Sequence, residues 1–220
     1  VVQRRAANGP LLEAAQQVLV KYMNVLGDLA ADKLPDVDSE VDGLSKALET
    51  AKFVGDGDKQ IRKETATAAA SIAKVLTRAI LDGYRQHEVV KIVKETNQHL
   101  QIVVEGLKEV LKKDMRESLV NEEVAIRKPF KAWDAAATSG NDPDGAPPIA
   151  RILLDERLEQ LRVKQANLDA YIEVLTTIGE GHAELFKHVD TLDQKAIKAR
   201  LQDYSKQLQT LYKGIKELSK

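Results

Sequence analysis

Apolar residues recur at alternating steps of three and four through the second half of the chain, which is the spacing of one side of an α-helix. The stripe is broken once, at 191–193, where Thr191 or Asp193 is a candidate cap for a new helical start. We therefore expect a helical arm over 148–218. Its stripe residues are Leu154, Leu158, Leu161, Gln165, Leu168, Ile172, Leu175, Gly179, His182, Phe186 and Val189, followed by Ile197, Leu201, Tyr204, Leu208, Leu211, Ile215 and Leu218.

A second stripe with the same spacing predicts another helical arm, over 58–138. Between Val110 and Leu111 the stripe shifts by one position, which we attribute to the difference between helical periodicity and a strict heptad. An isolated glycine weakens a helix without necessarily ending it, so we favour a continuous or bent helix at Gly83 over a hairpin. The stripe residues are Val89, Val93, Thr96, Leu100, Val103, Leu107 and Val110, followed by Leu111, Met115, Leu119, Glu122, Ile126, Phe130 and Trp133.

The segment 140–147, rich in Gly, Pro and Asp, separates the two arms and predicts a turn. For a turn centred there, the residue numbers of antiparallel partners add up to about 287. Leu119 then lies opposite Leu168, so that apolar residues meet. Gly106 falls near Gly179, and two glycine regions on facing helices predict that the two backbones approach closely.

Two shorter helices are expected before the arms. The first begins at Pro10 and ends at Leu34, and its wide apolar face predicts contact with more than one helix. The second begins at Asp38 or Ser39, both of which are good N-cap residues. The chain is thus predicted to be an all-α, elongated, antiparallel up-and-down helical bundle with two long arms and two shorter N-terminal helices, in a single domain over 1–220.

Charge and composition exclude several classes of partner and site. The chain has 33 basic and 34 acidic residues, and no basic block marks a phosphate-binding surface, so we expect no nucleic-acid partner. There is no cysteine, which excludes disulfides and thiolate metal sites. No apolar stretch reaches the roughly 18 residues of a membrane-spanning helix, so we expect no transmembrane segment in this chain.

No catalytic or cofactor motif occurs, so we predict no enzyme and no catalytic, cofactor-binding or metal residues. Four residues remain low-ranking ligand candidates. His182 lies on its stripe opposite Glu105. Either the two form a buried pair for proton transfer or metal binding or, as we favour, His182 is a hydrogen-bonded core group that fixes the alignment of the helices. His99 lies opposite His188, but two imidazoles are fewer than the three or four ligands of a zinc site.

Three segments, Tyr22–Ala30, Asp82–Arg85 and Ile178–Leu185, resemble those of uncharacterised helical lipoproteins or exported proteins of Gram-negative bacteria. The resemblance implies a periplasmic or outer-membrane-tethered protein, with a lipid tether upstream of Val1 as one candidate. It implies no activity.

We therefore favour a non-enzymatic interaction or scaffold protein that binds another protein. Phe130 and Trp133, near the tip of the predicted hairpin, are either core residues or an exposed anchor for that partner. The alternative is a bundle that binds a small ligand or metal through a polar seam around Glu105 and His182.

Overall fold

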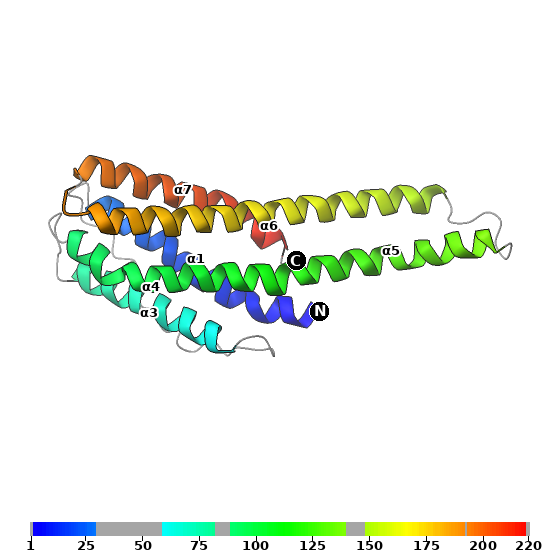
Figure 1. The fold of residues 1–220 in the computed structure, drawn as a ribbon, viewed down its shortest axis with the longest axis horizontal. Coiled ribbons are helices and arrows are strands. Elements are labelled where there is room, and N and C mark those ends of the chain that lie inside the picture. The colour runs from blue at the N-terminus through cyan, green and yellow to red at the C-terminus, as the bar shows by residue number, and fades with distance from the viewer. Residues whose placement is uncertain (1, 30–58, 82–88, 140–147, 192, 219–220) are drawn as a thin grey trace.

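The computed structural model describes residues 2–29, 59–81, 89–139, 148–191 and 193–218, and these residues are helical apart from short turns (Figure 1). No strand occurs among them, and the helices pack on one another, which confirms the predicted all-α bundle. The predicted helix from Asp38, the turn at 140–147 and Gly83 lie outside the described residues. The helices are α1 (Val2–Leu29), α3 (Lys59–Leu81), α4 (Val89–Val110), the π-helical turn η2 (Leu111–Met115), α5 (Arg116–Thr138), α6 (Pro148–His188) and α7 (Gln194–Leu218).

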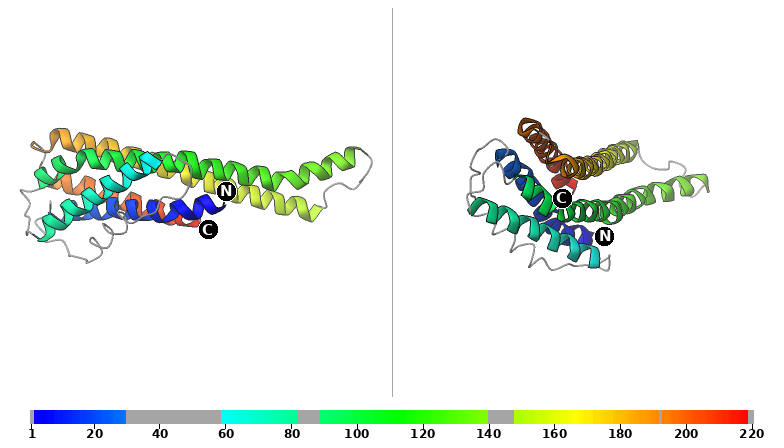
Figure 2. Two further views of the ribbon diagram at one scale, coloured as in Figure 1. Left: turned by 90° about the horizontal axis from the view of Figure 1, so that it is seen from below. Right: turned by 60° about the vertical axis from the view of Figure 1, so that its left-hand side comes forward.

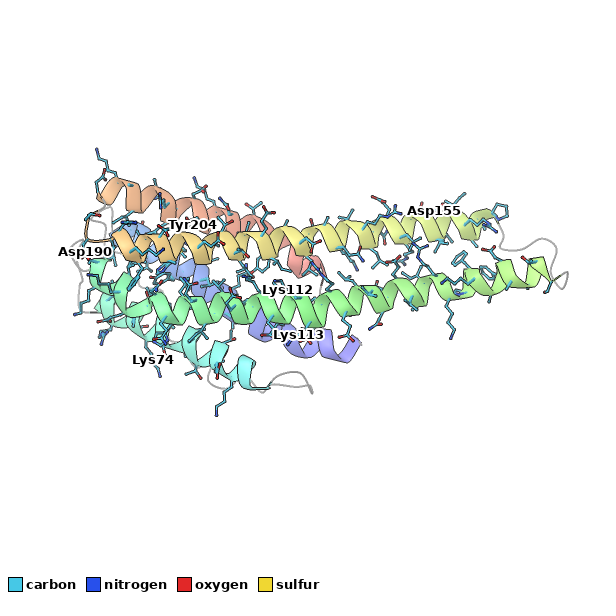
Figure 3. All side chains as sticks on the ribbon, in the orientation of Figure 1. Lys74, Lys112, Lys113, Asp155, Asp190 and Tyr204 are labelled. Atoms are coloured by element: carbon cyan, nitrogen blue, oxygen red, sulfur yellow. The ribbon has the colours of Figure 1, made fainter. Side chains whose placement is uncertain are left out.

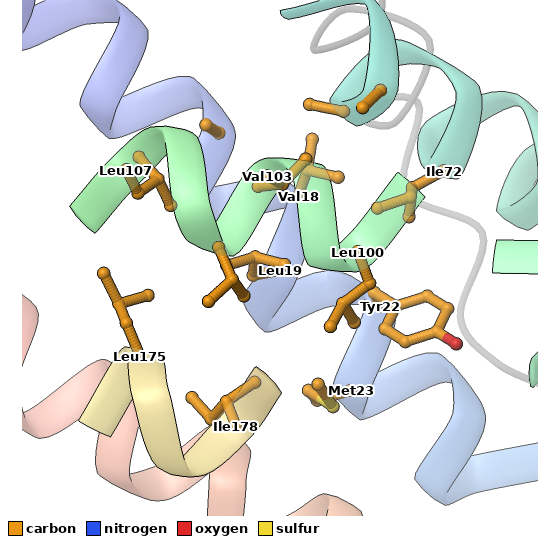
Figure 4. Packing of buried hydrophobic residues seen from close by; sticks show 14 of the residues in the cluster. Val18, Leu19, Tyr22, Met23, Ile72, Leu100, Val103, Leu107, Leu175 and Ile178 are labelled. Atoms are coloured by element: carbon orange, nitrogen blue, oxygen red, sulfur yellow. The ribbon is translucent and has the colours of Figure 1, made fainter. Parts of the chain in front are cut away.

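Helix α1 packs on several other helices of the bundle. Its wide apolar face was predicted to contact several helices, and it packs on α3, α4 and α7. Leu19, Tyr22 and Met23 are completely buried and lie among side chains of α4 and α6, including Leu175 and Ile178 (Figure 4). Burying a single Leu side chain stabilises a fold by about 1.5–3 kcal/mol, so this contact is a large part of what holds α1 in place.

The start of α1 was predicted too late. The helix begins at Val2 and runs through Pro10, the residue at which the sequence pattern placed its start. Residues 3–7 are Gln, Arg and Ala, which are all strong helix formers. The apolar stripe does not report this propensity, because the residues that carry it are mostly polar.

The prediction of a continuous or bent helix through Gly83 is wrong. Helices α3 and α4 pack side by side, and Arg78 of α3 forms a 2.8 Å ion pair with Glu95 of α4. In one straight helix these two residues would be roughly 25 Å apart, at 1.5 Å per residue. The apolar spacing happens to stay in phase across the reversal, so the stripe alone gave no sign of it.

The second predicted arm also reverses. The break near 191–193 is confirmed: the backbone N–H groups of Lys195 and Ala196 donate to Asp193 Oδ1 at 2.6 and 3.1 Å, so Asp193 caps α7. Helix α7 then folds back to pack on α6 and on α1 instead of extending α6. The two long arms are therefore shorter than predicted. Helix α3, at the start of the first arm, and helix α7, at the end of the second, fold back on the other helices instead of extending the arms.

The shift of the apolar stripe after Val110 has a structural cause other than the one we inferred. Residues 111–115 form a π-helical turn, in which the backbone N–H of Arg116 donates to the Leu111 carbonyl, five residues back. Such a turn inserts one extra residue into a helix. Val110, Leu111 and Met115 consequently all stay buried, and the apolar side faces the core on both sides of the turn.

Two helices extend well beyond the rest of the molecule. Past η2, α5 and the first half of α6 continue as an antiparallel pair, while α1, α3 and α7 lie at the other end (Figures 1 and 2). We call α5 together with residues 148–169 of α6 the projection. With 23 residues in α5, its length is about 35 Å at 1.5 Å per residue.

Candidate functional site

Three polar side chains meet inside the apolar core and a fourth, half-buried one lies at its edge. We call them the polar cluster: Tyr22 of α1, Thr96 of α4 and His182 of α6 are buried, and Asn97 of α4 is half-buried. Tyr22 Oη lies 2.5 Å from Thr96 Oγ1 and 2.7 Å from His182 Nε2. His182 Nδ1 lies 3.0 Å from Asn97 Oδ1. Tyr22, Thr96 and His182 occupy positions on the apolar stripes of their helices, so the packing of those stripes carries them into the core.

The direction of the hydrogen bonds follows from the acceptor at one end. The Asn97 side-chain oxygen only accepts, so His182 donates to it from Nδ1, and the neutral ring accepts at Nε2 from the Tyr22 hydroxyl. The Thr96 hydroxyl is within reach of both Tyr22 Oη and the Ile92 carbonyl, which is 2.7 Å away. The cluster thereby joins α1, α4 and α6 through neutral hydrogen bonds.

Burial keeps the polar cluster uncharged. It lowers the pKa of His182 to about 4. It also raises the pKa of Tyr22 far above its ordinary value, and the hydrogen bond with Thr96 only partly opposes this effect. A general acid or base works best with a pKa near the working pH. The geometry therefore suits a role in aligning three helices better than a role in proton transfer at neutral pH.

The predicted pairing of His182 with Glu105 is wrong. Glu105 is exposed and forms a 2.8 Å ion pair with Lys108 on its own helix. The residue that faces His182 is Asn97, two helical turns away from Glu105. The extra residue of the π-helical turn accounts for part of this change in alignment, because it lies between the predicted turn and this layer of the bundle.

The other histidine candidates are not gathered around His182. His99 is partly buried on α4, and His188 is exposed, with Nε2 3.6 Å from Glu184 Oε2 on the same helix. Within the described residues, no three His, Asp or Glu side chains form a group that could hold a metal ion. Of the four ligand candidates, only His182 belongs to the polar cluster. Its partners Tyr22 and Asn97 could not be predicted from the sequence, because both lie on other helices at separations that no motif encodes.

Of the two glycine predictions, the one for Gly179 is confirmed and the one for Gly106 is wrong. A Cβ atom on Gly179 would lie 3.2 Å from both Gln101 Oε1 and Val104 Cγ1 of α4, so the predicted close contact there is confirmed. A Cβ atom on Gly106 would instead collide with Thr65, whose Cβ is 2.9 Å away. Gly106 thus brings α3 close to α4, whereas the sequence predicted that it faces α6.

The projection carries most of the exposed apolar side chains. Among the described residues, seven of the eight large hydrophobic side chains that are exposed lie on it, and the other is Phe186. The exposed fraction reaches 70% at Ile149 and 62% at Val124. The seven are Val120, Val124, Trp133, Ile149, Ile152, Leu153 and Val163. The off-stripe spacing of Ile149, Ile152 and Leu153 was a signal in the sequence that we did not use.

The inner side of the projection is closed by apolar contacts and ion pairs. Leu119, Leu158 and Leu161 are buried between α5 and α6. Three ion pairs cross between the helices: Arg116 with Asp169, Arg151 with Asp134 at 2.7 Å, and Lys164 with Glu122 at 3.9 Å. These contacts use the facing sides of the two helices, so the exposed apolar residues are left over after the hairpin has formed.

The candidate anchor residues lie where the sequence placed them, on the distal half of α5. Phe130 is partly buried, and its ring meets that of Trp133 edge to face, with ring centroids 5.2 Å apart. Trp133 is 37% exposed. Phe130 therefore packs against Trp133, and Trp133 presents part of its ring to solvent.

Comparison of the chain with protein-family models, with curated proteins and with solved structures gave no match. Over the described residues, no helix combines the length and the apolar character needed to cross a bilayer.

Proposed function

We propose that this protein is a non-enzymatic interaction or scaffold protein, and that the projection is its binding element. The observation that carries the proposal is the concentration of exposed apolar side chains on the projection. Scattered surface hydrophobics are ordinary, whereas a group of them on one part of a molecule is characteristic of an interaction surface.

The shape of the molecule supports the same proposal. Buried apolar residues are numerous on α1, α3, α4 and the second half of α6, whereas among the described side chains of α5 only the proximal residues Ser118 and Leu119 are buried. Helix α5 packs along α6 and continues from η2. Because the distal part of the projection contributes little to the core, its side chains can serve as a binding surface.

The polar cluster supports a structural role. Its members satisfy one another by hydrogen bonds, and burial holds His182 neutral at pH 7. No observation in the described residues favours the alternative function, a small-ligand or metal-binding bundle around Glu105 and His182, because these two side chains lie apart. Export and a lipid tether stay predictions; mass spectrometry of the native N-terminus in cell fractions tests them.

Site-specific photo-crosslinking tests the role of the projection. A photoreactive phenylalanine analogue is placed at Val124 or Ile152 on the projection, or at Glu180 on the exposed side of α6 within the bundle. We expect adducts in the producing cells from the two projection sites and none from Glu180. Equal adduct yields at all three positions, or none at any, would overturn the proposal.

A further inference from the structure

We propose that the projection binds a second copy of this chain, with α5 of each copy packed against α6 of the other. This inference rests on the proposed function, because it names the occupant of the projection. Three observations carry it: unpaired charges of opposite sign on the two helices, apolar side chains on both sides of those charges, and the size of the surface.

The charges lie midway along the projection. Lys128 and Lys131 of α5 are exposed, as are Asp155 and Glu156 of α6, and none of the four has an ion-pair partner among the described residues. Figure 3 shows the position of Asp155, far from the body of the bundle. Side chains that face each other elsewhere along the hairpin do pair, as in Arg151 with Asp134.

The pair Arg151 and Asp134 also fixes which residues of α5 and α6 are level with each other. By this alignment Lys131 is level with Asp155, and Lys128 is within one turn of Glu156. The basic pair on α5 and the acidic pair on α6 therefore lie at the same height on the projection. A second copy placed alongside at that height brings its acidic pair to the basic pair of the first copy, and its basic pair to the acidic pair.

Apolar side chains flank the charges in both directions. Val120, Val124 and Val163 lie toward the bundle, and Ile149 and Ile152 lie toward the tip, all of them exposed. When two copies are aligned so that their charged pairs are level, the apolar side chains of one copy lie opposite apolar side chains of the other. In a dimer with a twofold axis each of these contacts occurs twice, because residue i meets j and j meets i, as in other isologous dimers.

The surface is large enough for a stable pair. One face of two adjacent helices about 35 Å long and about 10 Å wide each presents roughly 700 Å². Standard interfaces bury about 800 Å² on each partner. A net charge of −1 for the chain adds almost no overall repulsion between two copies.

Charge reversal on the two helices tests this inference with sedimentation equilibrium. One variant carries Lys128→Glu and Lys131→Glu, and a second carries Asp155→Lys and Glu156→Lys. We expect the wild-type chain to dimerise and each variant alone to bind at least about tenfold more weakly, which corresponds to 1.4 kcal/mol. An equimolar mixture of the two variants should regain most of the affinity as a heterodimer, because both contacts become complementary again. The matched control, Glu173→Lys with Glu180→Lys in the bundle part of α6, should dimerise like the wild type.

The outcomes separate this inference from the function on which it rests. A wild-type chain that stays monomeric at its highest soluble concentration overturns self-association, and so does a dimer that both reversals leave unchanged. Photo-crosslinks from Ile152 to a different protein, with a monomeric chain, would leave the interaction role in place and refute the second copy. Circular dichroism of each variant shows that the helices are retained, so that a loss of dimer is not a loss of fold.

Discussion

The buried hydroxyl of Tyr22 shows how a single residue fixes the alignment of three helices. Its aromatic ring fills the apolar core, as any large hydrophobic side chain would, whereas its oxygen has two partners on two other helices. An apolar core can slide by one turn with little loss, but a buried polar group that leaves its partner is left without a hydrogen bond. The polar cluster therefore makes one alignment of α1, α4 and α6 more stable than alignments that are shifted by a turn.

Tyr22→Phe should destabilise the bundle by about 1–3 kcal/mol, since the buried Nε2 atom of His182 loses its hydrogen-bond donor. Urea unfolding followed by circular dichroism measures the change. Thr177→Val, at an exposed position of α6, is the matched control for loss of a hydroxyl and should change stability little. Equal effects of the two substitutions would mean that the cluster contributes nothing specific.

The polar cluster also gives stability a predictable dependence on pH. The pKa of His182 is lowered to about 4 in the folded chain, while an unfolded histidine titrates near 6.5. The unfolded state therefore takes up the proton first, and stability falls as the pH drops from 6.5 toward 4, by up to about 3 kcal/mol from this group. Urea titrations at pH 7 and pH 4.5 measure the slope. His182→Gln should make this slope smaller, because the glutamine side chain does not take up a proton in this pH range.

At the scale of elements, the helical stripes predicted most of the buried residues but not the two chain reversals. Leu119, Leu161 and Leu168 are buried as their spacing indicated. The stripe of α3 stays in phase with that of α4, however, so periodicity cannot tell a straight helix from a hairpin there. The one-residue shift at Leu111 was visible in the sequence, but drift of a regular helix and a π-helical turn produce the same shift. Contacts between distant segments, such as Tyr22 with His182, have no local signature.

The contact between α3 and α4 depends on Gly106. Gly106→Ala places a Cβ atom against the Thr65 side chain, and Thr65 Cβ is too near the helix backbone to move aside easily. We expect a net loss of about 1–3 kcal/mol from overpacking, despite the better helix propensity of alanine. Thermal or urea unfolding tests this. The double variant with Thr65→Gly should recover part of the packing loss, and an unchanged stability of Gly106→Ala alone would show that α3 can shift freely.

At the scale of the whole molecule, the described chain has two parts: a body that contains most of the core, and a projection that exposes apolar side chains. In the body, α1 packs on α3, α4, η2 and α7. The projection buries a few leucines between its two helices and, among the described residues, exposes seven large hydrophobic side chains. Such a division predicts that stability and binding can be changed independently.

Removing the distal projection tests that independence. A chain in which Glu123 is joined to Arg162 by a short Gly-rich loop keeps every helix that packs on α1, because these two residues lie nearly level by the alignment of Glu122 with Lys164. We expect a cooperative unfolding transition with a smaller urea m-value, since less surface is exposed on unfolding, and a free energy of unfolding for the body that changes little. The same chain should give no dimer. Loss of cooperative unfolding would show instead that the projection is part of the core, and the exposed side chains would then need a different explanation.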